Sequence, residues 1–365
     1  MKYDVLVLGL GNIGLSLSRM LLDSGYKVAG ADLSGEKLRI LEGLGGYAFK
    51  ANLMNRGNIA PLVRSSRVVA SALPGGIAYK VLDILASFEE IKLVDVSFFP
   101  ESVSNLETRV SNKGSIFFLD CGVAPGLSNM LLRIGVEKAA GRKGYIYVGG
   151  ISEEPIEPLG FVATWNISDF IEEYIRPARI IHMGEVVALD PLSYREGRRF
   201  YEGVGELEYF PSDGLRSMLK NFKFMDELIE YTLRWPGHIE KMRFLKKLGF
   251  LDDNGLEICR GVSPRRILEH QLLKSLPKEG DMVVLEVEVH GGSRIRFTSI
   301  IKPWKGFSAM ALSTAGFQYS VVKSLVDNIL DINPGIHYPE DIPIEYFDWF
   351  KKVLKEMKIN IKEGS

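Results

Sequence analysis

The sequence is poor in cysteine and has no long apolar run. Only Cys121 and Cys259 occur among 365 residues, too few for a disulfide framework or a cysteine-rich zinc module. No stretch reaches the ~20 apolar residues that a membrane-spanning helix needs, and the amino terminus runs straight into a short apolar strand instead of a cleavable signal segment. We therefore expect a soluble, cytoplasmic protein.

The sequence also lacks an excess of either charge. Lysine and arginine total 45 against 46 acidic residues, a formal net charge of -1. Because proteins that bind nucleic acid or anionic membranes usually carry a basic excess, neither partner is expected. The five histidines show no H-E-x-x-H spacing, and the Walker A and G-x-S-x-G motifs are missing. No metal site is predicted.

The first third alternates short apolar runs with helical periodicity. Runs without polar alternation are typical of parallel strands buried on both faces, and strands that alternate with helices predict βαβ units. The sequence therefore predicts an α/β fold with a Rossmann-type doubly wound parallel sheet in residues 1–124. The predicted strands are 5–8, 27–31, 68–72, 93–96 and 116–119.

From about residue 144 the pattern changes to that of an α+β domain. The clearest signal is a hairpin over 281–301, in which apolar and polar residues alternate on both sides of Gly291-Gly292 and predict a sheet with one solvated face. We expect an inserted α+β substrate domain over 125–305 and a helical return segment over 306–365 that packs on the first domain. Further predicted elements are strands at 144–150, 159–166, 179–183 and 227–234, and helices at 239–248, 264–276 and 308–330.

A dinucleotide-binding pattern follows the first strand. The three glycines of a G-x-G-x-x-G suit a tight turn, close approach of the backbone to a pyrophosphate, and tight packing of helix on strand. The following helix then offers its amino-terminal N–H groups to the phosphates. The residues are Gly9, Gly11, Asn12, Ile13 and Gly14.

An acid at the end of the second strand selects the cofactor. Asp32 lies 18 residues after Gly14, close to the spacing of a carboxylate that binds a ribose hydroxyl. A carboxylate there repels the 2′-phosphate of NADP, so NAD is the expected cofactor. Leu73 and Pro74 end a later strand, where ligands of such sheets bind, and are candidate neighbours of the cofactor.

The reacting side draws on a turn after the strand at 116–119. Asp120 is a candidate proton acceptor or a holder of a substrate ammonium, although capping of the next helix is an open alternative. Cys121 and Gly122 are expected beside the cofactor, and Asn129 is a candidate substrate contact.

Two further polar patches are candidates for substrate binding. Arg234 and His238 lie within five positions at a strand end, where arginine can bind a carboxylate and histidine titrates near neutrality. Trp165 and Arg179 offer an aromatic wall and a second carboxylate-binding group. Surface roles for all of these side chains remain open alternatives.

Four motifs together resemble the saccharopine dehydrogenase-like family. They are the glycine motif at 9–14, Asp-Cys-Gly-Val-Ala-Pro-Gly-Leu at 120–127, Thr-Leu-Arg-Trp-Pro-Gly-His at 232–238, and Met-Ala-Leu-Ser-Thr-Ala-Gly at 310–316. The resemblance implies transfer of a hydride from a carbon that bears nitrogen to NAD. It is greatest to members that oxidatively deaminate the ε-amine of L-lysine to allysine, which cyclises to 1-piperideine-6-carboxylate.

Such a reaction assigns a role to each candidate. The ε-ammonium, with a reference pKa near ~10.4, must lose a proton before hydride leaves, and Asp120 or His238 is the candidate base. Arg234 or Arg179 would hold the α-carboxylate, and Trp165 would exclude water.

Other interpretations stay open. A saccharopine or carboxynorspermidine type enzyme acts on a secondary amine and needs more arginines for a second carboxylated arm. The chain has several candidates for that role: Arg176, Arg179, Arg195, Arg198 and Arg199. Outside enzymes, the alternative is an NAD-binding sensor. A homo-oligomer is expected, with the hairpin over 281–301 as a candidate contact.

Overall fold

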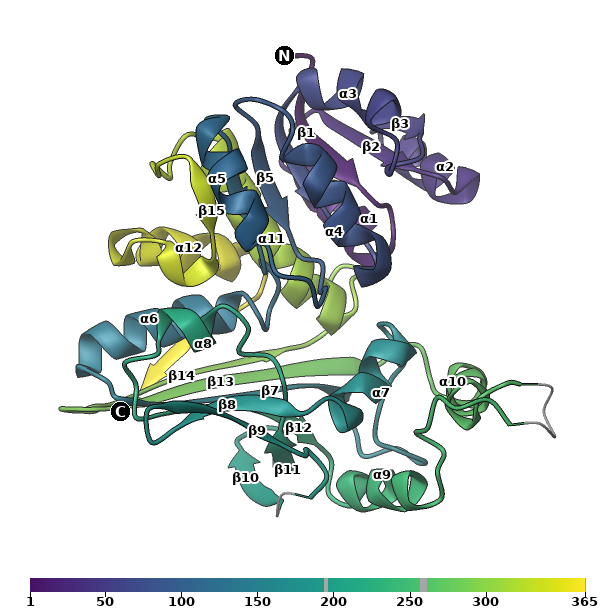
Figure 1. Cartoon of the computed structure of the whole chain (residues 1–365), viewed down its shortest axis with the longest axis vertical. Helices are drawn as coiled ribbons and strands as arrows, with labels where there is room; N and C mark the ends of the chain where they lie inside the picture. Colours follow the sequence, from purple (N-terminus) through teal and green to yellow (C-terminus); the bar gives the residue numbers. More distant parts are fainter. Residues whose placement is uncertain (194–195, 257–260, 365) are drawn as a thin grey trace. The chain divides into compact units, whose positions relative to one another are not determined.

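The computed structural model describes residues 1–193, 196–256 and 261–364 (Figure 1). The chain forms two compact units. Unit 1 contains Met1–Met130 and Ala311–Met357, and unit 2 contains Leu131–Met310 and Lys358–Ser365. The predicted boundaries at residues 124 and 305 lie near these, but the last residues belong to unit 2 instead of the return segment. Within the described ranges, no helix has both the length and the apolar character needed to cross a bilayer.

Unit 1 is built on a seven-stranded sheet in which every strand pairing is parallel. The strand order is β15-β6-β5-β4-β1-β2-β3, so the chain reverses direction across the sheet beside β1, between β2 and β4. The predicted doubly wound α/β fold is confirmed. The strands are β1 (Tyr3–Leu8), β2 (Val28–Asp32), β3 (Tyr47–Lys50), β4 (Ser66–Ser71), β5 (Lys92–Asp95), β6 (Ile116–Phe118) and β15 (Gly335–His337).

Helices surround this sheet because its strands are apolar on both faces. Leu6, Val69 and Phe117 are buried in one core cluster with residues of α3 and α4. The helices of unit 1 are α1 (Asn12–Asp23), α2 (Gly35–Gly43), α3 (Arg56–Arg64), α4 (Gly75–Leu85), α5 (Ser104–Asn112), α11 (Ala309–Val326) and α12 (Phe347–Glu356), with short 3₁₀ turns at Pro339–Asp341 and Ile344–Tyr346. Helix α6 (Leu127–Ala139) begins in unit 1 and belongs to unit 2 from Leu131 onward.

The return segment is tied to the sheet by α11. The buried side chain of Gln318 donates from Nε2 to the backbone oxygens of Ser71 (2.9 Å) and Val94 (3.1 Å). These oxygens lie at the carboxyl ends of β4 and β5, so a residue from near the end of the chain fixes the edge of the sheet where ligands of this fold bind.

Unit 2 contains a mixed nine-stranded sheet, ordered β10-β11-β12-β7-β13-β14-β16, in which β8 also pairs with β12, and β9 pairs with β8. The predicted hairpin forms, with His290 opposite Arg294. The strands are β7 (Lys143–Ser152), β8 (Ala178–His182), β9 (Glu185–Leu189), β10 (Gly197–Tyr201), β11 (Gly205–Pro211), β12 (Glu227–Arg234), β13 (Asp281–His290), β14 (Arg294–Ile301) and β16 (Lys362–Gly364). The helices are α7 (Ile167–Ile175), α8 (Met218–Asn221), α9 (His238–Lys247) and α10 (Pro264–Ser275).

The predicted solvated face of the hairpin is wrong. Glu286 and Glu288 on β13 are only 3% and 4% exposed. Arg199 from β10 lies against them and pairs with both carboxylates, while its guanidinium sits 4.4 Å from the ring centre of Tyr147. Acidic side chains that looked solvated are therefore neutralised inside the unit. The outer strand β14 also pairs with β16, and the expected homo-oligomer stays a prediction.

The predicted strand at 159–166 is also wrong. This segment has no regular structure, although Leu159 and Phe161 are buried. Asn166 instead caps α7, since its Oδ1 accepts hydrogen bonds from the N–H groups of Ser168 and Asp169. The apolar run fills a core beside a helix instead of joining the sheet.

Candidate functional site

The glycine turn of unit 1 leaves a helix terminus open. Gly9 has a φ of +86°, and a Cβ on Gly14 would lie 1.9 Å from the Gly9 oxygen, so both positions need glycine. A Cβ on Gly11 would meet nothing within 4 Å, and α1 has neither a side-chain cap nor an acid in its first turn. The amino-terminal N–H groups, including those of Asn12 and Ile13, therefore fit a pyrophosphate.

Asp32 is held in place beside this turn. Its Oδ2 accepts a hydrogen bond from the Leu10 N–H (2.7 Å), and its Oδ1 accepts one from the Ser34 N–H (2.8 Å). A carboxylate accepts about four hydrogen bonds, so acceptor capacity remains for ribose hydroxyls. The residues of unit 1 thus fit both the pyrophosphate and the ribose of a dinucleotide.

The ends of β4 and α4 border the same edge of the sheet. Leu73 is buried, and its N–H donates to the Ser97 Oγ at 3.1 Å. Pro74 is the residue that precedes the first turn of α4. Their predicted contact with the cofactor stays a prediction.

Asp95 is a buried acid that the sequence analysis missed. It ends β5, and the N–H and Oγ of Ser97 donate to its two oxygens at 2.9 and 2.8 Å. Burial raises the pKa of Asp95 to about 7, and the charge of Asp120 adds to the rise, whereas hydrogen bonds from Ser71 and Ser97 oppose it. The sequence signal that could have identified Asp95 is its position as an acid at the end of an apolar run that predicts a strand.

The turn after β6 contains the second acid. Asp120 is 2% exposed and has a left-handed φ of 58°. Cys121 is fully buried, and its Sγ lies 3.6 Å from the Leu119 oxygen. Burial raises the pKa of the Cys121 thiol well above its usual value, with further contributions from Asp120 and Asp95. The thiol is therefore protonated near neutral pH and unsuited to nucleophilic chemistry.

Asn129 closes this turn onto another part of unit 1. Its Oδ1 accepts hydrogen bonds from the N–H of Gly126 (2.9 Å) and the Oγ of Ser128, and its Nδ2 donates to the Glu340 Oε2 at 2.8 Å. The Gly122 N–H bonds to the Pro125 oxygen at 3.0 Å. The amide thus has a structural role, and its predicted contact with substrate is untested.

In unit 2, Arg234 lies inside an aromatic cluster. The side chain is 1% exposed. Its Nε donates to the Tyr174 hydroxyl at 2.9 Å, Nη1 donates to the Leu233 oxygen, and Nη2 pairs with Glu173. The guanidinium therefore already has a carboxylate partner in unit 2.

His238 is bound at both ring nitrogens. Nδ1 lies 2.6 Å from the Leu159 oxygen and Nε2 lies 2.7 Å from the Tyr174 hydroxyl. Since a carbonyl only accepts, these contacts assign the proton to Nδ1. Burial, together with the positive charge of Arg234, lowers the pKa of His238 to about 3. The imidazole is therefore neutral near pH 7.

The two other predicted substrate residues, Arg179 and Trp165, differ in exposure and in their neighbours. Arg179 is exposed and pairs with Asp213 through Nε (2.8 Å) and Nη2 (3.0 Å). Trp165 packs against Phe170 in the cluster that contains Arg234 and His238. The indole N–H of Trp165 is buried and has no acceptor among the residues that the structure describes.

Each unit thus gathers part of the predicted set. Unit 1 brings the glycine turn, Asp32 and Asp120 to the carboxyl edge of one parallel sheet, and unit 2 brings Trp165, Arg234 and His238 into one cluster. Arg195 and Cys259 lie outside the described residues. Within the described part of the chain, no three His, Cys, Asp or Glu side chains form a group able to hold a metal ion.

Comparison with known proteins identifies the family. The model of the saccharopine dehydrogenase C-terminal domain matches residues 122–361, about two-thirds of the chain. The chain belongs to this family. The predicted resemblance to saccharopine dehydrogenase-like proteins is therefore confirmed at the level of the family.

The curated relatives of this chain have low sequence identity to it and are longer than it is. The mitochondrial alpha-aminoadipic semialdehyde synthases of Rattus norvegicus and Bos taurus are 23% and 24% identical over 276 and 275 residues, covering 69% of this chain and 29% of each relative. A Schizosaccharomyces pombe protein named saccharopine dehydrogenase [NADP(+), L-glutamate-forming] is 25% identical over 180 residues, covering 46% of this chain and 40% of that protein. The chain thus spans less than half the length of these relatives.

A solved structure has the same fold over the full length. The apo saccharopine dehydrogenase (L-Glu forming) from Saccharomyces cerevisiae matches with a TM-score of 0.82, covers 99% of both chains and is 18% identical. At this identity the match concerns the fold.

Proposed function

We propose that the protein is a nicotinamide-dinucleotide-dependent oxidoreductase that acts on the carbon–nitrogen bond of an amino-acid amine. The observation that carries the proposal is the open, uncapped amino terminus of α1 above Gly11, with Asp32 held beside it, in a chain of the saccharopine dehydrogenase family. NAD is the proposed cofactor, because the Asp32 carboxylate would repel a 2′-phosphate.

A secondary amine of the saccharopine type is the substrate that we favour. The support is the family match and the names of the relatives, among them a saccharopine dehydrogenase and the synthases of alpha-aminoadipic semialdehyde. The expectation from the sequence favoured the primary ε-amine of lysine, as in lysine 6-dehydrogenase, and the relatives support the alternative better.

Lysine remains the second candidate because of one observation. A saccharopine-type substrate has a second carboxylated arm that needs additional cations. Four of the arginines proposed for that arm are described, and each already pairs with an acid of unit 2: Arg176 with Glu172, Arg179 with Asp213, Arg198 with Glu206, and Arg199 with Glu286 and Glu288. Because these four arginines already have acidic partners, a substrate without the second carboxylated arm, such as lysine, is favoured by this observation.

The chemistry that we propose for the chain is transfer of a proton at a carboxyl group. When bound, the dinucleotide supplies the acceptor of a hydride from the carbon next to nitrogen. Asp120 accepts the proton of the substrate ammonium, and Asp95 stands behind it as a carboxyl whose pKa of about 7 suits exchange near neutral pH. His238 suits this role less well, because both of its ring nitrogens are hydrogen-bonded.

The test is a screen of substrates on the full chain. Saccharopine, lysine and ornithine are each mixed with NAD and with NADP, and the reduced nucleotide is followed by its absorbance. We expect turnover with saccharopine and NAD, and its loss in Asp120→Asn while the nucleotide still binds. Turnover with lysine alone would select the second candidate. Nucleotide binding without turnover on any amine would instead identify a sensor and refute the enzyme proposal.

A further inference from the structure

Unit 1 has a second concave site at the opposite edge of its sheet. A pocket of about 460 Å³ is lined by residues of α3, by the first residues of β4 and β5, and by the loop between α4 and β5. The glycine turn and Asp120 lie at the carboxyl ends of the strands, whereas this pocket lies at their amino ends. Since β4 has six residues, the two edges are separated by roughly 17 Å.

The lining of the pocket is mainly cationic. Five basic side chains line it against two acidic ones, Glu89 and Glu90. The basic residues are Arg56, Arg64, Arg67, Lys92 and Lys113. This excess contrasts with the whole chain, whose formal net charge is -1, so positive charge is concentrated here.

Two of these cations are used within the fold. Arg67 pairs with Asp4 at 3.4 Å and donates to the Val326 oxygen. Lys92 donates to the Leu325 oxygen at 3.3 Å. Both carbonyl groups end α11, where cations are favoured by the helix dipole. Arg67 and Lys92 therefore bind the end of α11, and the other three basic side chains are the candidates for binding a ligand in the pocket.

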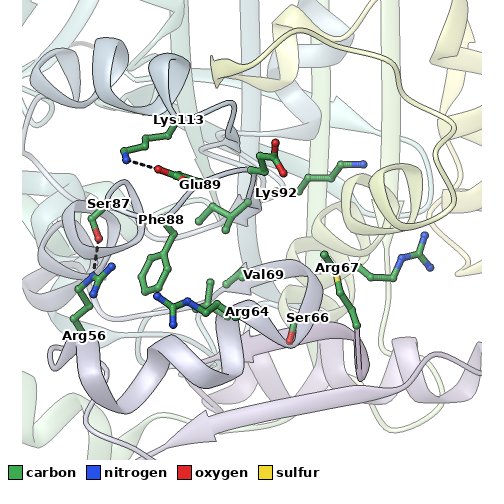
Figure 2. Close-up of a pocket in the computed structure, with 14 residues that line it drawn as sticks. Arg56, Arg64, Ser66, Arg67, Val69, Ser87, Phe88, Glu89, Lys92 and Lys113 are labelled. Carbon is green, nitrogen blue, oxygen red and sulfur yellow. Dashed lines mark hydrogen bonds and ion pairs between the residues drawn. The ribbon is translucent and has the colours of Figure 1, made fainter.

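The two arginines of α3 keep free donors. The guanidinium of Arg56 lies 4.7 Å from the ring centre of Phe88 and uses only its Nε, which donates to the Ser87 Oγ at 3.0 Å. Arg64 is exposed and has no hydrogen bond or ion pair among the described residues. Figure 2 shows Arg56 and Arg64 near the Phe88 ring, with Lys113 and Glu89 across the pocket from them.

Lys113 completes the site from α5. Its Nζ lies 2.7 Å from the Glu89 Oε1 in an exposed ion pair, and such pairs are weak and readily rearranged. An incoming anion can therefore share this ammonium group.

We infer that this pocket binds a small metabolite that carries carboxylate or phosphate groups. Guanidinium groups bind both kinds of anion with paired, charge-assisted hydrogen bonds, and the volume is that of a small-molecule site. The bound anion would relieve the repulsion between Arg56 and Arg64, neither of which has an ion pair among the described residues. The site is independent of the cofactor groove and of the proposed reaction.

Calorimetric titration of the full chain with citrate and, separately, with pyrophosphate tests the inference. Citrate represents the carboxylate source and pyrophosphate the phosphate source. We expect at least one of them to bind, with an affinity that falls as salt is added. Arg64→Gln breaks no contact of the described structure and should weaken binding about tenfold, the effect of losing a hydrogen bond to a charged group.

The double variant Arg56→Gln/Arg64→Gln should weaken binding further, while Lys352→Gln, an exposed cation on α12, should leave the affinity unchanged. Circular dichroism of each variant checks that it is folded. Absence of binding of either anion to the unaltered chain would overturn the inference. Binding that persists in the double variant would also overturn it, because that anion then occupies another site such as the amino terminus of α1.

Discussion

The carboxylate of Asp32 has a structural role, and we propose that it also selects the nucleotide. Two backbone N–H groups hold it at the end of β2, so its charge has a fixed position beside the glycine turn. Of the nearby basic residues, Lys37 and Arg39 lie one turn further along α2. We therefore expect selection between the two nucleotides to depend mainly on the charge of this carboxylate.

Asp32→Asn should shift the preference of the protein toward NADP. The amide keeps an acceptor for the Leu10 N–H but removes the charge that repels a 2′-phosphate. We expect the ratio of the NADP to the NAD affinity to rise roughly tenfold, equivalent to ~1.4 kcal/mol, as measured by fluorescence titration with the reduced nucleotides. Glu36→Gln, in the first turn of α2, is the matched control. An unchanged ratio would show that Asp32 does not face the ribose.

Glu230 makes the stability of unit 2 depend on pH. It is buried on β12, and its Oε2 has no hydrogen-bond partner among the described residues. Burial raises the pKa of Glu230 from 4.5 to about 8, and the charges of Glu173 and Asp213 add to the rise. Between these two values the folded chain keeps a proton that the unfolded chain has lost, so the free energy of unfolding decreases as the pH increases.

Glu230→Gln should remove this dependence. Between pH 6.5 and pH 8 the unaltered protein should lose about 2 kcal/mol relative to the variant, since the contribution of His238 is the same in both proteins and cancels. Urea unfolding at several pH values measures the difference. The exposed Glu240→Gln on α9 is the control and should keep the slope of the unaltered protein. Parallel pH profiles for Glu230→Gln and the unaltered chain would contradict the assignment.

At the scale of elements, the turn between β1 and α1 contains two glycines whose surroundings differ. A Cβ on Gly14 would overlap the Gly9 oxygen, whereas a Cβ on Gly11 would meet open space. Gly11 has φ −70° and ψ −170°, which alanine adopts without strain. Gly14 is therefore required by the packing of the helix on the turn, whereas the packing leaves room for a side chain at Gly11, where we propose that a ligand approaches.

Alanine at these two glycines should give opposite results. Gly14→Ala should lower the free energy of unfolding by roughly 3 kcal/mol, because a backbone contact has to move. Gly11→Ala should keep its stability within ~0.5 kcal/mol and lose most of its affinity for the dinucleotide. Thermal unfolding and nucleotide titration are measured on both variants. If Gly11→Ala bound the dinucleotide normally, the pyrophosphate would not cross this turn.

Many of the strands and helices can be predicted from the sequence. The apolar runs and the glycine motif predict five of the strands of unit 1, because the signal lies within a few neighbouring residues. Ion pairs between residues that are far apart in the sequence could not be predicted. Arg234 pairs with Glu173, 61 positions away, and Arg199 pairs with Glu288, 89 positions away. For that reason the sequence analysis treated Arg234 as a free carboxylate binder and the acids of β13 as solvated.

At the scale of the whole molecule, unit 1 is made from two separate parts of the chain. Residues 311–357 supply α11, α12 and the edge strand β15, which pairs with β6. Phe350 of α12 is fully buried, with its ring centre 6.3 Å from that of Phe317. The sequence predicted a return segment, since an apolar stripe on 347–357 needs a surface to cover, but not the short strand β15.

A chain that ends at residue 330 should fail to form unit 1. It lacks β15, α12 and the Glu340 carboxylate that binds Asn129. We expect loss of dinucleotide binding and of a cooperative unfolding transition for this unit, as measured by nucleotide titration and calorimetry. A chain that ends at residue 361 loses β16, whose three residues are exposed and belong to unit 2, and is the control for unit 1. Normal nucleotide affinity in the shorter chain would show that residues 331–365 are not needed for the nucleotide site.

The divided origin of unit 1 also sets an order of events during synthesis. When residue 130 leaves the ribosome, six strands of the sheet exist, but the outer side of β6 has no partner until β15 is translated. An unpaired strand edge invites association with other chains, and about 200 residues have to be added at 5–20 residues per second before it closes. A nascent chain therefore exposes this edge for roughly 10–40 s, and a chaperone that covers β6 during that interval would increase the yield of folded protein.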